Sequence, residues 1–367
     1  MPNPSEVKPP NSLTKPSTMN ALIVTDIGKP VTLTKSRDIP TPGPSQVQIQ
    51  VTVAGVNPHD QKCRDGGFLI ADKLPAVLAM DVVGRVTTVA DGVTKYSVGD
   101  RVVAQSSLEA GNPQNGLQQY AVVDVDLSAR IPDSVSDDGA ATLPSNIIAP
   151  LVALFSADTL GFPAPWTSAA AGFDFAGQTL LVIGGGTSCG KLGVQLAKLA
   201  GIGRIVVVGG DKALLASYGA THVVSRHGGE EKVLASIRDV VGDDLIYAYD
   251  AYNVAPNQHL ALNALSNTKR GVLARLLTTG DPDADKIHSK AQGYEVRNVY
   301  GSSHMYRELA EAFWTRLPEY LADGRIKPLT SFEVFEPGLD ADKVNYVLDR
   351  YRDGETVVKP HFHISVV

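Results

Sequence analysis

The chain has 367 residues, enough for two compact domains, and its 43% hydrophobic and 20% charged content is typical of a soluble globular protein. Its 33 basic and 39 acidic residues give a formal charge of −6 without charge blocks, which argues against nucleic-acid and anionic-membrane partners. No apolar run approaches the ~18 residues of a membrane span. Two cysteines, Cys63 and Cys189, provide neither a disulfide framework nor a four-thiolate zinc site, so we expect a cytoplasmic protein.

The first third of the chain predicts a tail followed by short strands. Residues 1–18 contain five prolines and no apolar stretch, and we expect a disordered tail with ordered structure from Met19. Apolar and polar residues alternate along 47–53, which predicts an antiparallel barrel or sandwich. The strands expected in this part cover 21–26, 31–36, 46–56, 76–90, 101–105 and 117–124.

From Gly177 onward, apolar strands alternate with helical segments, and this order predicts a parallel, doubly wound sheet. The expected strands cover 180–183, 205–208, 222–224, 245–249, 272–278 and 296–300. The helices expected between them cover 212–218, 230–241 and 259–265. Two amphipathic helices over 306–321 and 340–351 and a strand over 361–366 are expected at the end.

The most informative stretch is a glycine-rich turn between the first strand of this part and the next helical segment. A strand, a glycine turn and a helix in this order direct free backbone N–H groups and a positive helix end toward a pyrophosphate. Glycine is needed because the turn is tight and phosphates approach the main chain closely. The expected phosphate-binding residues are Gly184, Gly185, Gly186, Thr187, Ser188, Cys189 and Gly190. The spacing is not GxGxxG, so a buried turn without a ligand is the alternative.

The residues after the second and third strands bear on the choice of cofactor. NAD enzymes place an acid after the second strand for the ribose hydroxyls, whereas NADP enzymes place positive charge around the 2′-phosphate. Asp211, after Gly210, is the candidate acid, with a helix N-cap as its alternative role. Lys212 and Arg226 are candidate phosphate ligands, and a cation in a solvated loop is the alternative role of Arg226. Taken together, these residues favour NADPH.

Several motifs resemble one enzyme superfamily. Residues 98–102, VGDRV, look like the barrel motif of the medium-chain dehydrogenases/reductases. Residues 54–60, AGVNPHD, are similar to the G-x-N-P-x-D segment of its zinc-free quinone oxidoreductase and enoyl reductase branch. Residues 143–146, 153–155 and 161–165 resemble a fungal subgroup that includes the trans-acting enoyl reductases serving polyketide synthases. The resemblance covers nearly the whole chain after the tail.

The resemblance implies an α/β fold in three parts. A β-rich, GroES-like barrel domain is expected at 19–148, a Rossmann-type doubly wound parallel sheet at 149–302, and a segment completing the catalytic domain at 303–367. It also bears on metal binding, because Asn57 stands where zinc-dependent members place a cysteine ligand. Residues 79–81, Ala-Met-Asp, replace the usual Gly-His-Glu, so we expect no metal site.

The resemblance also places side chains near the nicotinamide and the substrate. Lys62 stands where related enoyl reductases have a lysine lining the cleft, and it would orient the substrate or the ribose or donate a proton; a surface lysine without a role is the alternative. Cys189 is expected to pack as a small hydrophobic residue. The implied catalytic candidates are Lys62 and Asn57, and the implied cofactor contacts outside the phosphate-binding turn are His59, Asp60, Lys62, Asp250, Leu277, Thr278 and Val358.

Without a metal or a Ser/His/Asp constellation, a bound cofactor must carry the reaction. The sequence therefore predicts an NADPH-dependent, zinc-independent reductase of activated C=C bonds, an enoyl or enone reductase of fungal secondary metabolism. Its expected substrate is a small or carrier-bound unsaturated carbonyl compound, with a polyketide synthase as a candidate partner. The alternatives are an NADPH quinone reductase and a catalytically idle nucleotide-binding protein; Lys62 in an intact Asn-Pro-x-Asp segment favours an enzyme.

Overall fold

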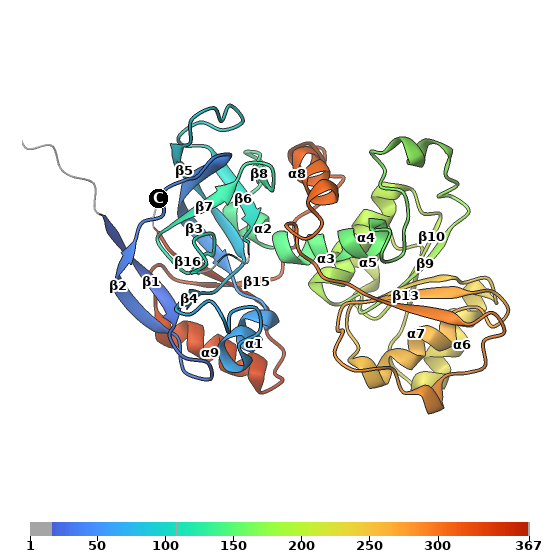
Figure 1. Cartoon of the computed structure of the whole chain (residues 1–367). Helices are drawn as coiled ribbons and strands as arrows, with labels where there is room; N and C mark the ends of the chain where they lie inside the picture. Colours follow the sequence, from blue (N-terminus) through green and yellow to red (C-terminus); the bar gives the residue numbers. More distant parts are fainter. Residues whose placement is uncertain (1–16, 108, 110, 366–367) are drawn as a thin grey trace, which may run out of the picture.

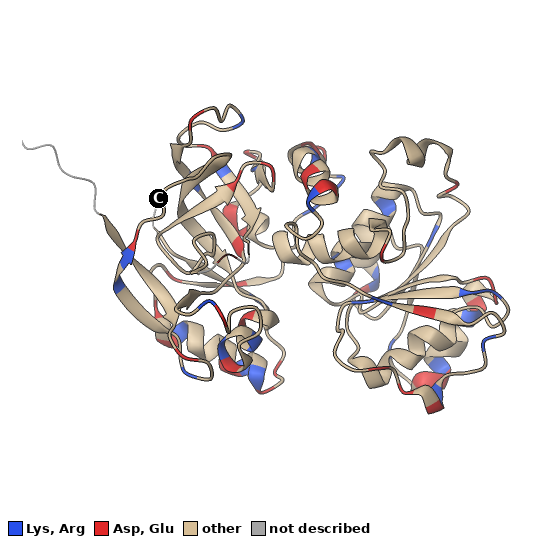
Figure 2. Cartoon of the chain, in the orientation of Figure 1, with Lys and Arg blue, Asp and Glu red and all other residues tan. Residues whose placement is uncertain are grey.

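The computed structural model describes residues 17–107, 109 and 111–365. Figure 1 shows a body built mostly of strands beside a body built of a sheet flanked by helices, with helix α3 (Pro144–Phe155) between them. Most of the expected tail, residues 1–16, lies outside the described residues, and the first strand begins at Thr18. Basic and acidic residues are interspersed over both bodies (Figure 2). Within the described ranges, no helix combines the length and the apolar character needed to cross a membrane.

The strand-rich body contains two sheets. The larger has the order β15-β16-β3-β5-β6-β8, with β7 also paired to β3, and the smaller has the order β2-β1-β4. β16, from the end of the chain, pairs antiparallel with β3 and brings the last residues beside the segment that follows β3. The strands are β1 (Thr18–Val24), β2 (Thr32–Asp38), β3 (Gln46–Gly55), β4 (Ala76–Val77), β5 (Asp81–Val89), β6 (Arg101–Gln105), β7 (Tyr120–Asp124), β8 (Ser128–Arg130), β15 (Phe332–Phe335) and β16 (Lys359–His363).

The expected strand over 76–90 is wrong as a single element, because the structure divides it into β4 and β5. Ala79, between the two, has a positive φ of 70°. Its N–H donates to the Asp60 carboxylate (2.9 Å), and its carbonyl accepts from the Gly116 N–H (2.7 Å). These contacts replace strand pairing at Ala79 and turn the chain toward Asp81.

The second body is a six-stranded parallel sheet with the order β11-β10-β9-β12-β13-β14, which confirms the predicted fold class. Ile183 in β9 lies opposite Val208 in β10 and Asp250 in β12, so the carboxyl ends of these strands meet at one edge. The strands are β9 (Thr179–Ile183), β10 (Arg204–Val208), β11 (His222–Val224), β12 (Tyr247–Asp250), β13 (Gly271–Arg275) and β14 (Tyr294–Asn298).

Helices cover the sheets, and the sequence predicted only some of them. α3 has no readable amphipathic period, because eleven of its twelve residues are buried. The remaining helices are α1 (Pro58–Gly66), α2 (Asp137–Ala141), α4 (Ser188–Ala200), α5 (Lys212–Tyr218), α6 (Glu230–Val241), α7 (His259–Ala264), α8 (Arg307–Ala322) and α9 (Ala341–Arg352), with short 3₁₀ turns η1 (Ser168–Gly172), η2 (Ala255–Gln258) and η3 (Ala284–Lys286).

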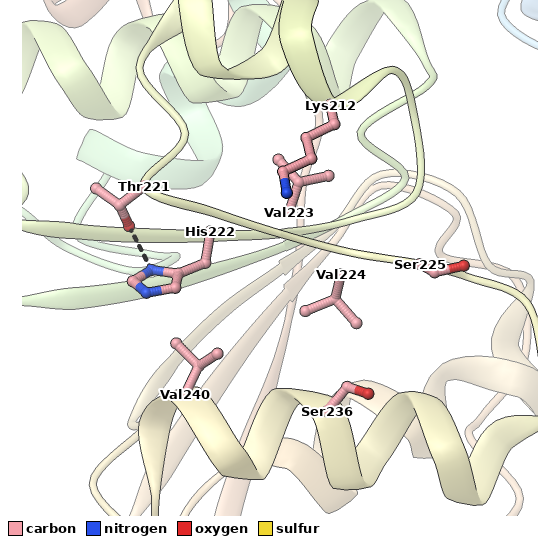
Figure 3. Close-up of a pocket in the computed structure, with 8 residues that line it drawn as sticks. All are labelled: Lys212, Thr221, His222, Val223, Val224, Ser225, Ser236 and Val240. Carbon is pink, nitrogen blue, oxygen red and sulfur yellow. Dashed lines mark hydrogen bonds between the residues drawn. The ribbon is translucent and has the colours of Figure 1, made fainter.

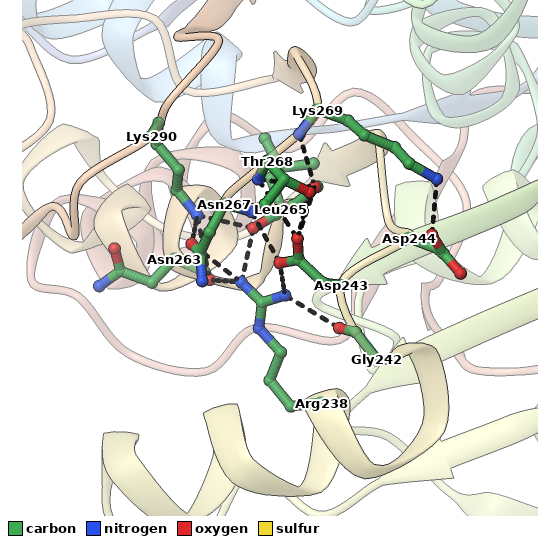
Figure 4. Close-up of polar contacts among 11 residues, drawn as sticks. Arg238, Gly242, Asp243, Asp244, Asn263, Leu265, Asn267, Thr268, Lys269 and Lys290 are labelled. Carbon is green, nitrogen blue, oxygen red and sulfur yellow. Dashed lines mark hydrogen bonds and ion pairs between the residues drawn. The ribbon is translucent and has the colours of Figure 1, made fainter.

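A polar network ties the loops at the amino ends of β12, β13 and β14 (Figure 4). Asp243 accepts hydrogen bonds from the Asn267 N–H (2.7 Å), the Thr268 hydroxyl (2.6 Å) and Arg238 (3.0 Å). Arg238 and Lys290 both donate to the carbonyl of Leu265 (2.6 Å each). This network lies at the opposite end of the strands from the glycine turn, and we assign it to the stability of the sheet.

Candidate active site and cofactor site

The glycine turn after β9 is closed so tightly that side chains are excluded from it. A Cβ on Gly190 would lie 2.2 Å from the carbonyl oxygen of Gly184, and a Cβ on Gly185 would lie 2.6 Å from that of Gly209. Gly184 has a φ of 90°, a conformation that glycine adopts without strain. The turn therefore lies directly against the end of β10, as a site that takes a pyrophosphate at the backbone requires.

Helix α4 begins at this turn with its N–H groups directed out of the sheet edge. Thr187 is the N-cap, and its hydroxyl accepts from the Gly190 N–H (2.9 Å) and donates to the Gly184 carbonyl (2.9 Å). The first N–H groups of a helix have no acceptor within the helix. Thr187 takes one of them, and those of Ser188 and Cys189 stand at the positive helix end, where an anion is stabilised.

Asp211 and Arg226 both lie near the end of β10, but their side chains make different contacts. The Asp211 carboxylate accepts from the Leu214 N–H (2.7 Å), which makes Asp211 the N-cap of α5. The side chain of Arg226 lies over Gly209, where its Cδ would be 3.3 Å from an added Cβ. The aliphatic part of the Arg226 side chain therefore lies at the end of β10, close to the glycine turn. Arg226 as a whole is exposed to solvent.

Lys212 is the first residue of α5, and its side chain lies beside the edge strand β11. It lines a cavity of about 370 Å³, and Figure 3 shows its amine beside Val223. The lining residues are Lys212, Thr221, His222, Val223, Val224, Ser225, Ser236 and Val240. Arg226 is not among the residues that line this cavity.

The turn after β12 places Asp250 inside the protein and Tyr252 outside. The Asp250 carboxylate accepts from the backbone N–H groups of Tyr252 (3.0 Å) and Asn253 (2.9 Å) and from the Asn253 side chain (3.0 Å). Burial raises the pKa of Asp250, and these hydrogen bonds limit the rise. Asp250 thus shapes the turn. Tyr252, which the sequence analysis missed, is 59% exposed, and its Cβ lies 2.7 Å from where a Cβ on Gly184 would be.

The loop after β13 is held by the buried side chain of Arg275. Arg275 donates to the carbonyls of Thr278 (3.2 Å) and Gly280 (2.8 Å), and Gln258 donates to the carbonyl of Leu277 (2.9 Å). Leu277 and Thr278 are therefore fixed at the carboxyl edge of the sheet. Val358, the other residue expected near the nicotinamide, is 43% exposed just before β16.

Between the two bodies, a buried lysine lies between an amide and a carboxylate. The Lys359 ammonium donates to the Asn57 side-chain oxygen (2.8 Å) and contacts Asp81 Oδ2. Asn57 also donates to Asp81 (2.9 Å), and the Ser145 N–H donates to the other Asp81 oxygen (2.8 Å). Burial by itself raises the pKa of Asp81, but the adjacent Lys359 charge and the hydrogen bonds bring that pKa below its usual range. Asp81 is therefore ionised. The sequence analysis named Asn57 and, within the segment 357–359 that the resemblance places near the nicotinamide, chose Val358 rather than Lys359 as the site residue.

The Asn-Pro-x-Asp segment forms the start of α1. Asp60 accepts from the Asn57 N–H (2.8 Å) and the Ala79 N–H (2.9 Å), so it fixes the positions of both segments. His59 is partly exposed, with its Nε2 atom 3.8 Å from Asp60 Oδ2. Lys62 lies one turn further along the helix with its side chain in solvent. The structure thus brings Asn57 and Asp60 together and leaves the Lys62 side chain exposed.

The cluster around Asp81 is linked to the glycine turn through α3. Ser145 and Asn146 lie at the start of α3, which packs against α4. The Cys189 thiol in the turn is 3.7 Å from the Asn146 side-chain oxygen. Burial, together with Asp81, raises the pKa of Cys189 to about 12, so the thiol is neutral. This series of contacts connects the cluster of Asn57, Asp81 and Lys359 to the phosphate turn.

Comparison with known proteins identifies the family. Residues 43–133 match the alcohol dehydrogenase GroES-like domain. The trans-enoyl reductase tazE of Aspergillus terreus is 30% identical over 266 residues, which cover 70% of this chain and 84% of that protein. The chain belongs to the medium-chain dehydrogenase/reductase superfamily. The trans-enoyl reductase resD of Aspergillus sclerotiorum is 29% identical over 330 residues, which cover 84% of this chain and 90% of that protein.

Solved medium-chain dehydrogenase/reductase structures share the fold. An alcohol dehydrogenase superfamily protein from Novosphingobium aromaticivorans has a TM-score of 0.74 at 23% identity, covering 95% of this chain and 100% of its own. The CurK enoyl reductase has a TM-score of 0.72 at 16% identity, covering 95% of this chain and 99% of its own. The protein is therefore an oxidoreductase of a superfamily that binds a nicotinamide cofactor, and its glycine turn fits a dinucleotide.

The zinc ion of some medium-chain dehydrogenases does not fit the residues of this member. In the part of the chain that the structure describes, no group of three His, Cys, Asp or Glu side chains is placed to hold a metal. At Asn57 and Asp81 the space between the two side chains holds the Lys359 ammonium, which would repel a divalent cation. We therefore derive no chemical step through a metal.

Proposed function

We propose that this medium-chain reductase is an NADPH-dependent, zinc-independent enoyl reductase that saturates the C=C bond of an α,β-unsaturated carbonyl compound. The observation that carries the proposal is the similarity to proteins named trans-enoyl reductases, which extends over 84% of the chain for one of them. The site supports the proposal, because a glycine turn without room for side chains is linked through α3 to a buried ammonium, and no group of metal ligands is found in the described residues.

The reaction divides between the cofactor and the side chains. When bound, the reduced nicotinamide supplies a hydride for the β-carbon of the substrate. Negative charge then develops on the carbonyl oxygen and needs a hydrogen-bond donor, while the α-carbon needs a proton. We assign the proton to Lys62, whose exposed amine stands near the start of α1, and assign Asn57 to holding the Asp81 cluster, because both ends of its amide are hydrogen-bonded there.

The proposal covers the form of the substrate. Four of the matching relatives are named trans-enoyl reductases. We propose that the acyl chain is presented on a carrier and that a polyketide synthase is the partner.

Transfer of an isotopic label tests the reaction. With NADPH deuterated at the transferable position and an enoyl thioester or an enone, we expect deuterium at the β-carbon of the product and an intact carbonyl group. A chelator should leave the rate unchanged. Product analysis by NMR measures the position of the label. Deuterium on a carbinol carbon would show carbonyl reduction and refute the proposal, and turnover of quinones alone would replace it with a quinone reductase.

The preference for NADPH over NADH is tested by a variant that should lose NADPH binding selectively. We expect NADPH to bind at least about tenfold tighter than NADH, a difference of about 1.4 kcal/mol. Arg226→Ala should remove most of that preference, because its guanidinium stands at the end of β10, and should leave NADH binding nearly unchanged. Fluorescence titration measures both constants. Lys212→Ala is the matched control, with a smaller effect expected because its amine lies beside Val223. Equal losses for both cofactors in Arg226→Ala would contradict the assignment.

A further inference from the structure

The Lys359 ammonium has one more N–H donor than it has hydrogen-bond acceptors in the part of the protein that the structure describes. A lysine ammonium donates three hydrogen bonds. Among the described residues, its acceptors are the side chains of Asn57 (2.8 Å) and Asp81. The side chain of Lys359 is 5% exposed and that of Asp81 is 0% exposed. One N–H of this buried cation thus has no protein acceptor among the described residues.

The surrounding backbone is built to hold this ammonium. A Cβ on Gly55 would lie 3.1 Å from both the Cε and the Nζ atom of Lys359, so the missing side chain of Gly55 leaves room for the lysine. Two apolar side chains in place of a buried ion pair often give equal or greater stability. Stability alone therefore does not account for a buried ion pair that keeps an unused donor.

The ammonium is also linked to the expected phosphate turn through the start of α3. Asp81, which contacts Lys359, accepts from the N–H of Ser145 at the start of α3. The next residue, Asn146, is 3.7 Å from the thiol of Cys189 in the phosphate turn. The charges of Lys359 and Asp81 both act on that thiol. A substrate that meets a cofactor bound at this turn therefore approaches the same cluster.

We propose that Lys359 is a catalytic residue that donates its free N–H to the carbonyl oxygen of the unsaturated substrate. The role rests on the proposed function. As a C–H bond forms at the β-carbon with the arriving hydride, the C=C electron pair moves to the bond between the α-carbon and the carbonyl carbon. The carbonyl electron pair moves to oxygen, where the ammonium stabilises it. A proton from the Lys62 ammonium then bonds to the α-carbon, and the carbonyl re-forms. Lys359 donates a hydrogen bond and transfers no proton.

The test removes the ammonium without leaving a buried unpaired charge. Lys359→Met alone would leave the Asp81 carboxylate buried without its cation. The main variant is therefore the double substitution Lys359→Met with Asp81→Asn, which replaces the ion pair by neutral groups of similar size. The probe is a crotonyl thioester labelled with ¹³C at the carbonyl carbon, bound together with NADP⁺ so that no turnover occurs. Infrared difference spectroscopy measures its carbonyl band, and circular dichroism with thermal unfolding verifies the fold.

We expect the carbonyl band of the probe to move to lower wavenumber in the wild-type protein and to stay near its solution position in the double variant. With NADPH, kcat of the double variant should fall by about 10²–10³-fold. A folded double variant with the wild-type band or the wild-type kcat would overturn the proposal. If the double variant does not fold, Lys359→Arg decides, because a guanidinium keeps the charge but moves the donors. An unchanged band in Lys359→Arg would overturn the proposal, and a displaced band supports it.

The spectroscopic and chemical readouts separate the two proposals. A Lys359-dependent band in a wild-type protein that transfers no deuterium to the β-carbon would support Lys359 as the carbonyl ligand and refute the enoyl reductase reaction. Deuterium at the β-carbon with a band that does not depend on Lys359 would leave the reaction in place and refute the role of Lys359.

Discussion

Replacing Gly190 by alanine should abolish most dinucleotide binding, because the added methyl group has no space in the turn. Its Cβ would lie 2.2 Å from the carbonyl oxygen and 2.9 Å from the carbonyl carbon of Gly184. Both contacts are with backbone, so the start of α4 must move away from β9. A misplacement of ~1 Å can cost ~10²-fold in catalysis, and overpacking costs about 1–3 kcal/mol of stability. We expect a loss of NADPH affinity of the same order, up to about a hundredfold.

Isothermal titration with NADPH and chemical unfolding measure the two effects of Gly190→Ala separately. Gly172→Ala is the matched control, because Gly172 has no atom within 4 Å of an added Cβ and lies in the exposed turn η1. The control should leave both quantities unchanged. Wild-type NADPH affinity in Gly190→Ala would show that the glycine turn does not hold the pyrophosphate.

Replacing Lys62 by alanine should reduce turnover without affecting the fold. Its side chain is exposed on α1, so its removal opens no cavity. A positioned acid contributes about 10²–10⁴-fold to a rate, and we expect kcat to fall within that range while KM changes little. Steady-state kinetics measures both constants.

Gln61→Ala is the control for Lys62→Ala. Gln61 is the preceding residue of the same helix, about 100° around its axis, and it bonds to Asp65 (2.8 Å) on that side. Its removal should leave kcat unchanged. An increase in KM alone in Lys62→Ala would assign Lys62 to holding the substrate or the ribose. Unchanged kcat and KM would return Lys62 to the role of a surface lysine.

Much of the architecture was predictable because it leaves local patterns in the sequence. The alternation along 47–53 lies within β3, and the bounds of α5 and α6 agree with the predicted helices. The glycine turn was identified from composition because a backbone that approaches other backbone excludes side chains wherever the turn occurs. By contrast, α3 was missed because burial on all sides leaves no polar face to set a period.

The roles of individual charged residues were decided by the tertiary structure. Asp211 and Lys212 are neighbours in sequence, yet one caps α5 and the other lies along β11. The contact between Lys359 and Asn57 joins residues 302 positions apart. It exists because the last strand of the chain pairs with β3. Periodicity records which face of an element is buried, but not which distant element covers it. A buried ammonium held by two partners from other strands and loops is therefore a property that only the assembled fold creates.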